Sequence, residues 1–158
     1  MRNIEYISGG KELLDKVAPL WNKLKKHHVE VSLHFLESIS ERTFEWRKSI
    51  LIKKSEKGKL RVDLAKLSNS RTYIAYCVST IDREGVGEID SIFISKKYRN
   101  HGVGNFLMKR SLKWMDKFDV KSKFIIVLAG NEDVYPFYKK FGFVPAWSRL
   151  EYDRRILD

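Results

Sequence analysis

Apolar residues recur along the chain with two different spacings, which predict where helices and strands lie. In three long segments an apolar residue returns every three or four positions, the period of a helix with one buried face. These segments are Lys11–Lys26, Phe35–Ile50 and Val103–Phe118. Pro19 lies inside the first one and is expected to kink or split that helix.

Shorter segments rich in β-branched and aromatic residues are typical of strands. They lie around Ile4 and Tyr6 and over residues 60–67, 73–81, 88–94, 124–128 and 144–152, the last as one or two strands. Consecutive strands favour antiparallel pairing, whereas the strand–helix–strand unit from Glu88 to Leu128 requires a parallel pair. We therefore expect one α+β domain over residues 1–158, with a mixed, mostly antiparallel sheet of six to seven strands flanked by about four helices.

A loop with two glycines, Arg99-Asn100-His101-Gly102-Val103-Gly104, joins a predicted strand to a predicted helix. Free N–H groups at a helix start bind anions, and glycine lets the backbone approach them closely. Two known phosphate loops do not fit: the P-loop needs Lys-Ser/Thr where Asn105-Phe106 follow, and the dinucleotide fingerprint needs a small residue where Leu107 stands.

The remaining pattern, Arg-x-x-Gly-x-Gly before an amphipathic helix, resembles the acyl-CoA pyrophosphate loop of the GNAT superfamily of N-acetyltransferases. The segment from Asn131 to Phe143 is similar to a second GNAT signature, an asparagine after a strand and then a helix ending Tyr-x-x-x-Phe-Gly-Phe. We expect that helix over residues 131–141, with Gly142 as its C-terminal cap. The resemblance covers roughly residues 73–152. It implies a GNAT-like sheet splayed at a central bulge, with acetyl-CoA between the fourth and fifth strands.

The resemblance assigns three groups of residues to acetyl-CoA: a strand end, the glycine loop and the second motif. They are Ile92, Phe93 and Ile94, then Arg99, Asn100, His101, Gly102, Val103, Gly104 and Asn105, and finally Asn131 and Tyr138. The 3′-phosphate has several candidate partners among the basic side chains, and the sequence does not choose between Lys96, Lys97, Arg99 and Lys139.

The reaction implied is direct attack of a primary amine on the acetyl thioester. Glu88 is the first candidate for the general base, directly or through water, and Asp90 follows on the same strand face, where it can share that role or bind substrate. Tyr138 matches the family's general-acid tyrosine. The structural alternatives are a solvated strand acid for the two carboxylates and a packed aromatic for Tyr138.

The acceptor is not identified by the sequence. Its candidate contacts are Trp21 and His28 beside Asp90, and a small-molecule amine is favoured over a protein. The adjacent His27 and His28 suggest a metal, but no third ligand is placed by spacing, so no metal is expected. The oligomeric state is not readable from the sequence; family members are often dimers, so the resemblance leaves a homodimer open.

The net charge of +11 is concentrated, because residues 96–123 alone hold nine bases and two acids. Such a field attracts a polyanion, either a phosphorylated cofactor or a nucleic acid. The sequence has no helix-turn-helix, zinc-finger or RNP signature, so nucleic-acid binding is the lesser alternative. A non-catalytic acyl-CoA-binding module of the same fold is the other alternative.

Two further features bear on location. The single cysteine, Cys77, lies in an apolar stretch and is expected to be a buried thiol rather than a nucleophile. No apolar run approaches the roughly 18 residues that cross a membrane, and the start of the chain lacks a signal-peptide pattern. We expect a cytoplasmic protein that is not inserted in a membrane.

Overall fold

The computed structural model describes residues 3–157, and the strands in this range form one sheet of five in the order β1-β2-β3-β4-β5. They are β1 (Ile4–Gly9), β2 (Lys59–Leu67), β3 (Tyr73–Ile81), β4 (Val86–Ile94) and β5 (Ser122–Ile125). The first four pair antiparallel and β5 is parallel to β4, which confirms the predicted mixed, mostly antiparallel sheet. The prediction of six to seven strands is wrong, because residues 144–152 form no strand within the described chain.

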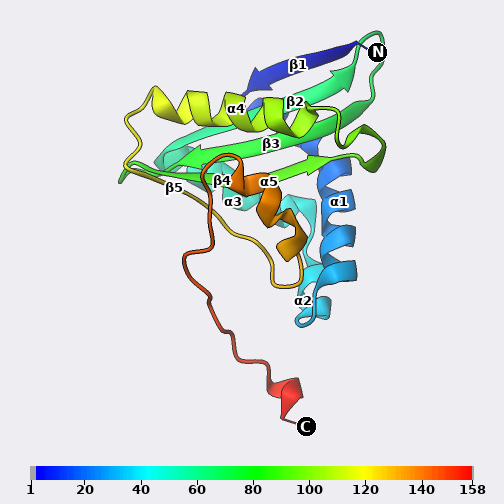
Figure 1. Ribbon diagram of the computed structural model, residues 1–158, viewed down its shortest axis with the longest axis vertical. Helices are drawn as coiled ribbons and strands as arrows, with labels where there is room; N and C mark the ends of the chain where they lie inside the picture. The colour runs from blue at the N-terminus through cyan, green and yellow to red at the C-terminus, as the bar shows by residue number, and fades with distance from the viewer. Residues whose placement is uncertain (1–2, 158) are drawn as a thin grey trace.

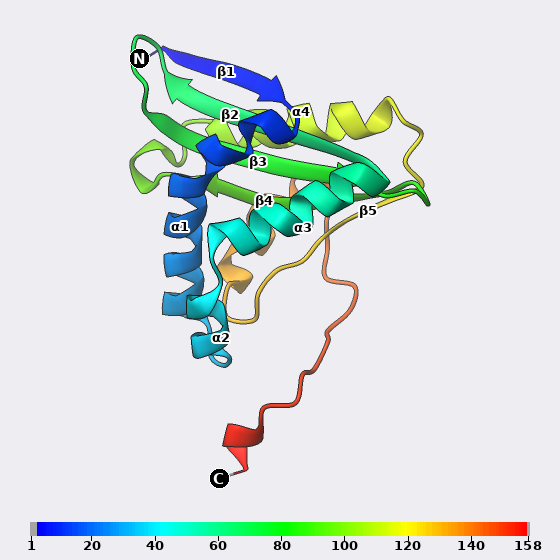
Figure 2. The ribbon, with the colours of Figure 1, turned by 180° about the vertical axis from the view of Figure 1, so that it is seen from behind.

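Helices cover both faces of the sheet (Figures 1 and 2). One face packs against α4 (Val103–Asp116), and the other packs against α1 (Leu14–Val31) and α3 (Phe44–Lys57). Two helices are short, α2 (Leu36–Glu41) and α5 (Tyr135–Lys139). The sheet therefore separates two buried apolar layers, and Cys77 lies in the α4 layer as the buried thiol that the sequence predicted.

Two helix predictions need correction. Pro19 does not split α1, which runs unbroken from Leu14, so the proline removes only one N–H from the second turn. The helix expected from Phe35 to Ile50 is instead two helices separated at Arg42-Thr43. The Thr43 side chain accepts a hydrogen bond from the Trp46 N–H at 3.1 Å. It therefore caps α3 and starts a new helix.

A β-bulge interrupts the pairing of β3 with β4. Val78 faces Ser91 and Ser79 faces Ile89, so Asp90 is the extra residue with no partner opposite it in this register. The bulge lies in the middle of β4, close to the point where β5 separates from it. The pairing of β4 with β5 ends at Ile89 and Ile125, although β4 continues to Ile94.

The chain beyond this separation explains two further differences. The strand predicted over residues 124–128 begins at Ser122 and ends at Ile125, because residues 126–128 diverge from β4 and have no strand to pair with in the described structure. The predicted helix over residues 131–141 is a 3-10 turn (Glu132–Val134) followed by α5. Gly142 caps α5 as predicted, with a φ of 86° and a bond from the next N–H, of Phe143, to the Tyr138 carbonyl at 3.3 Å.

After Phe143 the chain leaves the body of the molecule, as both views show (Figures 1 and 2). Trp147 and Leu150 in this segment are 97% and 95% exposed. None of the helices formed by residues 3–157 combines the length and the apolar composition needed to cross a bilayer.

Candidate active site

A cavity of about 580 Å³ opens where β4 and β5 separate, a volume typical of small-molecule sites. Its walls come from the second half of β4, the segment 125–128, the C-terminal half of α1, α5 and the loop that leads into α4. The cavity thus joins five segments, which are brought together from separate parts of the sequence. Of the residues predicted for a site, it is lined by His28, Asp90, Ile92, Phe93, Ile94, Arg99, Asn100, Gly102, Gly104, Asn105, Asn131 and Tyr138.

The loop into α4 has the backbone of an anion site. Asn100 and Gly102 have φ values of 63° and 82°, left-handed conformations that turn the chain sharply. The first helical bond runs from the Phe106 N–H to the Gly102 carbonyl at 2.9 Å. The N–H groups of Val103 and Gly104 precede that bond, and no side chain of the described residues caps this end of the helix. With the positive end of the helix dipole, these N–H groups favour a bound anion.

Gly104 has a second reason to be glycine. A Cβ at this position would lie 3.2 Å from both Ile94 Cδ1 and Phe137 Cζ, closer than side chains normally pack. The absence of a side chain lets α4 begin directly against the end of β4 and against α5. A Cβ on Gly102, in contrast, would meet no described atom within 4 Å.

Two histidines of α1 face the cavity. His27 Nε2 lies 3.0 Å from Asn131 Oδ1, which ties α1 to the loop after β5. Burial lowers the pKa of His28 from its usual 6.5 to about 4, helped by the charges of His27 and Arg42, so His28 is neutral at pH 7. The contact between His27 and Asn131 joins residues 104 positions apart, so it could not be deduced from the spacing of residues in the sequence.

Tyr138 projects from α5 into the same cavity, with its ring 5.3 Å from the ring of Phe137. Burial raises the pKa of its hydroxyl from 10.0 to about 12. The hydroxyl therefore remains a proton-bearing donor throughout the neutral range.

Asp90, the bulge residue, is held by an ion-pair cluster on the α3 side of the sheet. Lys54 Nζ lies 2.5 Å from both Asp90 Oδ1 and Glu88 Oε2, and Arg47 Nη2 lies 3.2 Å from Asp90 Oδ1. Thr80 donates to the other Asp90 oxygen at 2.5 Å. Burial by itself would lower the pKa of Lys54, but its charge and hydrogen-bond contacts with Asp90 and Glu88 outweigh burial, and the net shift is upward.

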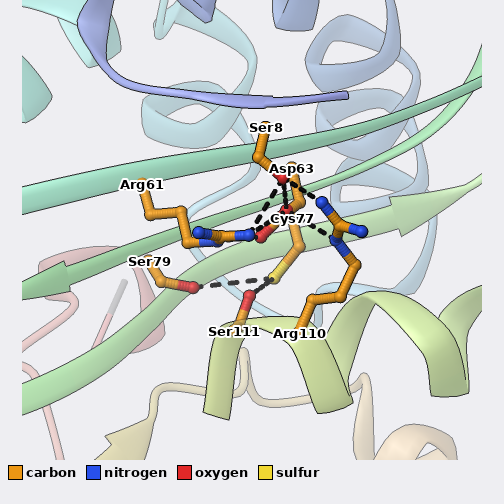
Figure 3. Close-up of polar contacts among 7 residues, drawn as sticks. All are labelled: Ser8, Arg61, Asp63, Cys77, Ser79, Arg110 and Ser111. Atoms are coloured by element: carbon orange, nitrogen blue, oxygen red, sulfur yellow. Dashed lines mark hydrogen bonds and ion pairs between the residues drawn. The ribbon is translucent and has the colours of Figure 1, made fainter. Parts of the chain in front are cut away.

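A second buried aspartate, Asp63, lies on the opposite side of the sheet under α4 (Figure 3). Arg61 Nε reaches its Oδ2 at 2.6 Å, Arg110 Nε reaches its Oδ1 at 3.1 Å, and the Ser8 hydroxyl donates to Oδ1 at 2.6 Å.

Cys77 lies in the same view, where its sulfur accepts a hydrogen bond from the Ser111 hydroxyl. Burial raises the pKa of its thiol to about 12, so the sulfur is an unreactive thiol rather than a nucleophile.

Several predicted residues do not line the cavity: Trp21, Glu88, His101 and Val103, and, among the candidates for the 3′-phosphate, Lys96, Lys97 and Lys139. Trp21 packs in the core, its ring 5.7 Å from that of Phe44, and Val103 is the first residue of α4 and is buried on the side of the helix that packs against the sheet. His101 Nδ1 lies 2.6 Å from the Arg99 carbonyl. Glu88 forms an ion pair with Lys54.

Lys54 is the residue that the sequence did not reveal. It lies seven positions after Arg47, two helical turns along one face of α3, and both cations face a strand with acids two positions apart. Two cations spaced seven residues apart on a predicted helix and two acids spaced two residues apart on a predicted strand were the signal in the sequence for these ion pairs.

Among residues 3–157, no three His, Cys, Asp or Glu side chains come close enough to hold a metal ion.

Sequence comparison supports the assignment made from the motifs. Residues 20–143 match the model of the Acetyltransferase (GNAT) family. An uncharacterized N-acetyltransferase of Methanocaldococcus jannaschii is 28% identical over 78 residues, which make up 46% of this chain and 34% of that protein. The match thus spans about a third of the length of this relative.

Solved structures share the fold at low sequence identity. An aminoglycoside N-acetyltransferase in complex with CoA superposes with a TM-score of 0.67 at 14% identity, covering 97% of this chain and 95% of that one. A ribosomal-protein-alanine N-acetyltransferase from Brucella melitensis biovar Abortus 2308 gives 0.65 at 11% identity, with 96% and 99% covered. The two motifs, the splayed sheet and the family match agree, and the chain belongs to the GNAT family of acetyltransferases.

Proposed function

We propose that the protein transfers the acetyl group of acetyl-CoA to a primary amine of a small acceptor. One observation carries the proposal: a cavity between separating parallel strands ends on the free N–H groups of a helix start. A CoA molecule needs this combination, because its pyrophosphate is anionic and its pantetheine arm is long and narrow.

The residues around the cavity fit such a molecule. The edge of β4 from Ile92 to Ile94 is not paired with β5, so its main-chain groups are available to the pantetheine amides. The N–H groups from Asn100 to Gly104 would hold the pyrophosphate, and Asn131 would lie beside the arm while bonded to His27. Arg99 lies with its guanidinium 5.6 Å from the Phe93 ring centre and donates to the Ile94 carbonyl at 2.9 Å, which positions a cation beside the phosphate groups.

Acetyl-CoA supplies an activated acetyl thioester, so the protein's main task is to provide a neutral amine. At pH 7 an amine of pKa about 10.4 is neutral in roughly one molecule in 2,500, a cost of about 4.6 kcal/mol. Glu88 is the proposed acceptor of that proton. Because Glu88 is bonded to Lys54 and lies outside the cavity wall, we propose that a water molecule relays the proton to it past Asp90.

Tyr138 is the proposed donor to the departing sulfur. A CoA thiol has a pKa near that of cysteine, about 8.5, so complete transfer from a phenol of pKa about 12 is uphill by about 5 kcal/mol. The hydroxyl therefore acts chiefly by donating a hydrogen bond as negative charge builds on sulfur. Removing one donor that stabilises developing negative charge typically slows a reaction by about 10²- to 10³-fold.

The acceptor enters, in this proposal, beside His28 and Asp90. The negative charge of Asp90 is already matched by Lys54 and Arg47, and His28 is neutral. This half of the cavity therefore offers little negative charge to a polycation. Together with the net charge of +11, it favours an amine of low positive charge.

Calorimetric titration with acetyl-CoA at moderate salt tests the cofactor assignment, using Gly102→Glu with Gly142→Glu as its matched control. Both glycines have a φ near +85° and a Cβ position free of described atoms, so the backbone strain is the same in both variants. We expect saturable one-to-one binding that Gly102→Glu loses and Gly142→Glu keeps. Absence of binding by the unmodified protein, or equal loss in both variants, would overturn the proposal.

The chemical step is tested separately with Tyr138→Phe, by following thiol release with a panel of amines. Tyr135→Phe is the control, because Tyr135 lies on the same short helix but does not line the cavity. We expect kcat to fall about 10²- to 10³-fold in Tyr138→Phe while acetyl-CoA binding is unchanged. Binding without turnover on any amine would instead favour the non-catalytic acyl-CoA-binding module.

A further inference from the structure

Basic side chains gather on the flank of α4 that lies over β1 and β2. An aromatic ring and three cations recur there at intervals of four, three and four residues, which places them in one row along the helix. This basic row consists of Phe106, Arg110, Lys113 and Lys117, the last at the C-cap of α4. Lys113 and Lys117 are exposed, and within the described chain neither lies in an ion pair. Their charges therefore face solvent without a matching acid.

The sheet adds a second arginine beside this row. Arg61 on β2 and Arg110 on α4 converge on the carboxylate of Asp63 from opposite sides (Figure 3). Both also donate to the Ser8 hydroxyl, Arg61 at 2.9 Å. One buried carboxylate thus fixes two guanidiniums, whose Nη1 groups make no hydrogen bond within residues 3–157. Arginines held in this way, with N–H groups to spare, suit phosphate oxygens, which accept paired N–H bonds from a guanidinium.

Aromatic rings lie next to these cations. The ring of Phe106 is 4.1 Å from that of Tyr6 on β1, and the Arg110 guanidinium is 5.6 Å from the Phe106 ring centre. Phe106 is nevertheless 43% exposed. Beyond the other end of the row, Lys59 Nζ lies 4.7 Å from the ring centre of Phe118, which is 41% exposed. Proteins that bind single-stranded nucleic acid combine such rings, on which bases stack, with cations that contact the phosphates.

The acetyl-CoA site does not account for this charge. The proposed pyrophosphate loop lies at the start of α4, whereas Lys113 is ten residues further along, or about 15 Å. Neither Lys113 nor Lys117 lines the cavity. The positive charge at this end of α4 therefore needs a different anionic partner.

We propose that this surface binds a single-stranded nucleic acid, as a property separate from the proposed acetyl transfer. From Phe106 to Lys117 the basic row is about 16 Å long, the length of about five phosphates at 3.4 Å each along one strand. Five cations border it: Lys59, Arg61, Arg110, Lys113 and Lys117. A single strand can place an unpaired base on Phe106, which a duplex cannot do without opening. An acidic protein would match the cations but would rarely offer a flat ring to the aromatic pair.

Fluorescence anisotropy tests the proposal, with a short labelled RNA of mixed sequence titrated with the full chain at several salt concentrations. The double variant Lys113→Glu, Lys117→Glu reverses two charges of the row. Its matched control is Lys23→Glu, Lys53→Glu, which makes the same change in net charge at exposed lysines of α1 and α3, on the other face of the sheet. Far-UV circular dichroism checks that both variants fold.

We expect the affinity of the unmodified protein to fall with salt, with a log–log slope of about −0.7 for each phosphate contacted, or about −3.5 for five cations. The row variant should bind about tenfold more weakly or worse and lose about 1.4 from the size of this slope, while the control changes little. Acetyl-CoA binding should be the same in all three proteins, so this test stands apart from that of the cofactor. Absence of RNA binding at low salt, or an equal loss in the two double variants, would overturn the proposal.

Phe106→Leu separates nucleic acid from other polyanions, because it keeps an apolar side chain but removes the ring. We expect its affinity for RNA to fall about fivefold or more, since a base loses its stacking partner. Its affinity for heparin, a polyanion without bases, should not change. An unchanged affinity for RNA would overturn the proposal. Tighter binding of the unmodified protein to vesicles of phosphatidylglycerol and phosphatidylcholine in equal parts than to RNA would also overturn it, and would assign the surface to a membrane.

Discussion

Two buried aspartates, Asp63 and Asp90, have nearly the same chemistry on opposite faces of one sheet. Their side chains are 1% and 0% exposed, and each is bound by two cationic side chains and a hydroxyl. Asp63 lies in a regular stretch of β2, opposite Cys77, and does not line the cavity. Asp90 is the extra residue of a bulge and does line it.

The comparison teaches that burial and ion pairing do not by themselves mark a functional carboxylate. Asp63 joins α4 to the sheet through Arg110, and its arrangement is that of a structural cross-link. Asp90 faces α3 by the same alternation as Glu88, and the bulge leaves it without a partner on β3 at a point of β4 that borders the cavity. The backbone, and not the set of partners, separates the two roles.

The largest effect is expected from Asp63→Ala. The substitution leaves Arg61 and Arg110 without their carboxylate, and breaking a buried pair in this way costs about 3 kcal/mol of unfolding free energy. Urea unfolding measures this loss, and the folded fraction should retain its kcat/KM. A large fall in kcat/KM without a loss of stability would contradict the structural role of Asp63.

Asp90→Asn should affect the reaction more than the fold. The amide keeps the size of the side chain but loses the charge that holds Lys54 beside Glu88, so we expect kcat/KM to fall about 10- to 100-fold, or about 1.4–2.8 kcal/mol. Asp63→Asn is the matched control. If the two asparagine variants behaved alike in thiol-release assays and in urea, the proposed difference between the aspartates would not hold.

A pH experiment tests the cavity side separately, because His28 lines the cavity. The pKa of His28 is about 4 in the folded protein and 6.5 in the unfolded chain. Between these values only the unfolded chain takes up the proton, so His28 costs no stability above pH 6.5 and progressively lowers stability as the pH falls toward 4.

Partial exposure of His28 reduces the effect, which we expect to be on the order of 1–2 kcal/mol. His28→Gln should therefore lose less stability than the unmodified protein between pH 7 and pH 5, as measured by urea unfolding at both values. His34→Gln, an exposed substitution, serves as the control. Parallel losses in all three proteins would show that His28 is not responsible.

The smallest effect is expected at an exposed ion pair. Lys48 Nζ lies 2.5 Å from Asp15 Oδ1, as close as any contact of Asp90, but Asp15 is 73% exposed. Water and salt screen such a pair, so Lys48→Ala should leave the thermal unfolding midpoint unchanged within error. A clear fall in Tm would mean that distance, rather than burial, determines the strength of these pairs.

The sequence predicted the parts of the molecule that depend on neighbouring residues. The turn at Gly102, the helix start at Val103 and the cap at Gly142 all follow from local backbone requirements, and the structure has each of them. The family match agrees with the resemblance that these motifs suggested.

Other features could not be predicted because they join distant segments. Asp90 meets Lys54 36 positions earlier in the chain, and His27 meets Asn131 across 104 positions. The number of strands also depends on pairing, because a segment with strand-like alternation becomes a strand only where its backbone forms hydrogen bonds with a neighbouring strand. The break between α2 and α3 had a local signal, the helix-capping residue Thr43, but the apolar spacing continues across it and suggested one helix.

The bulge at Asp90 has a further consequence, which is one of parity. Up to Ile89 the odd-numbered residues of β4 face α4, whereas beyond the bulge the even-numbered Ile92 and Ile94 pack in that layer and Phe93 packs in the other. The side chains of β4 therefore alternate in one phase before the bulge and in the opposite phase after it, and Asp90 is the extra residue that separates the two halves. Substituting Asp90 leaves the bulge intact, whereas deleting it would join the two halves of β4 in one regular alternation, with the same faces buried but without the local bend that a bulge gives to the strand at the cavity wall.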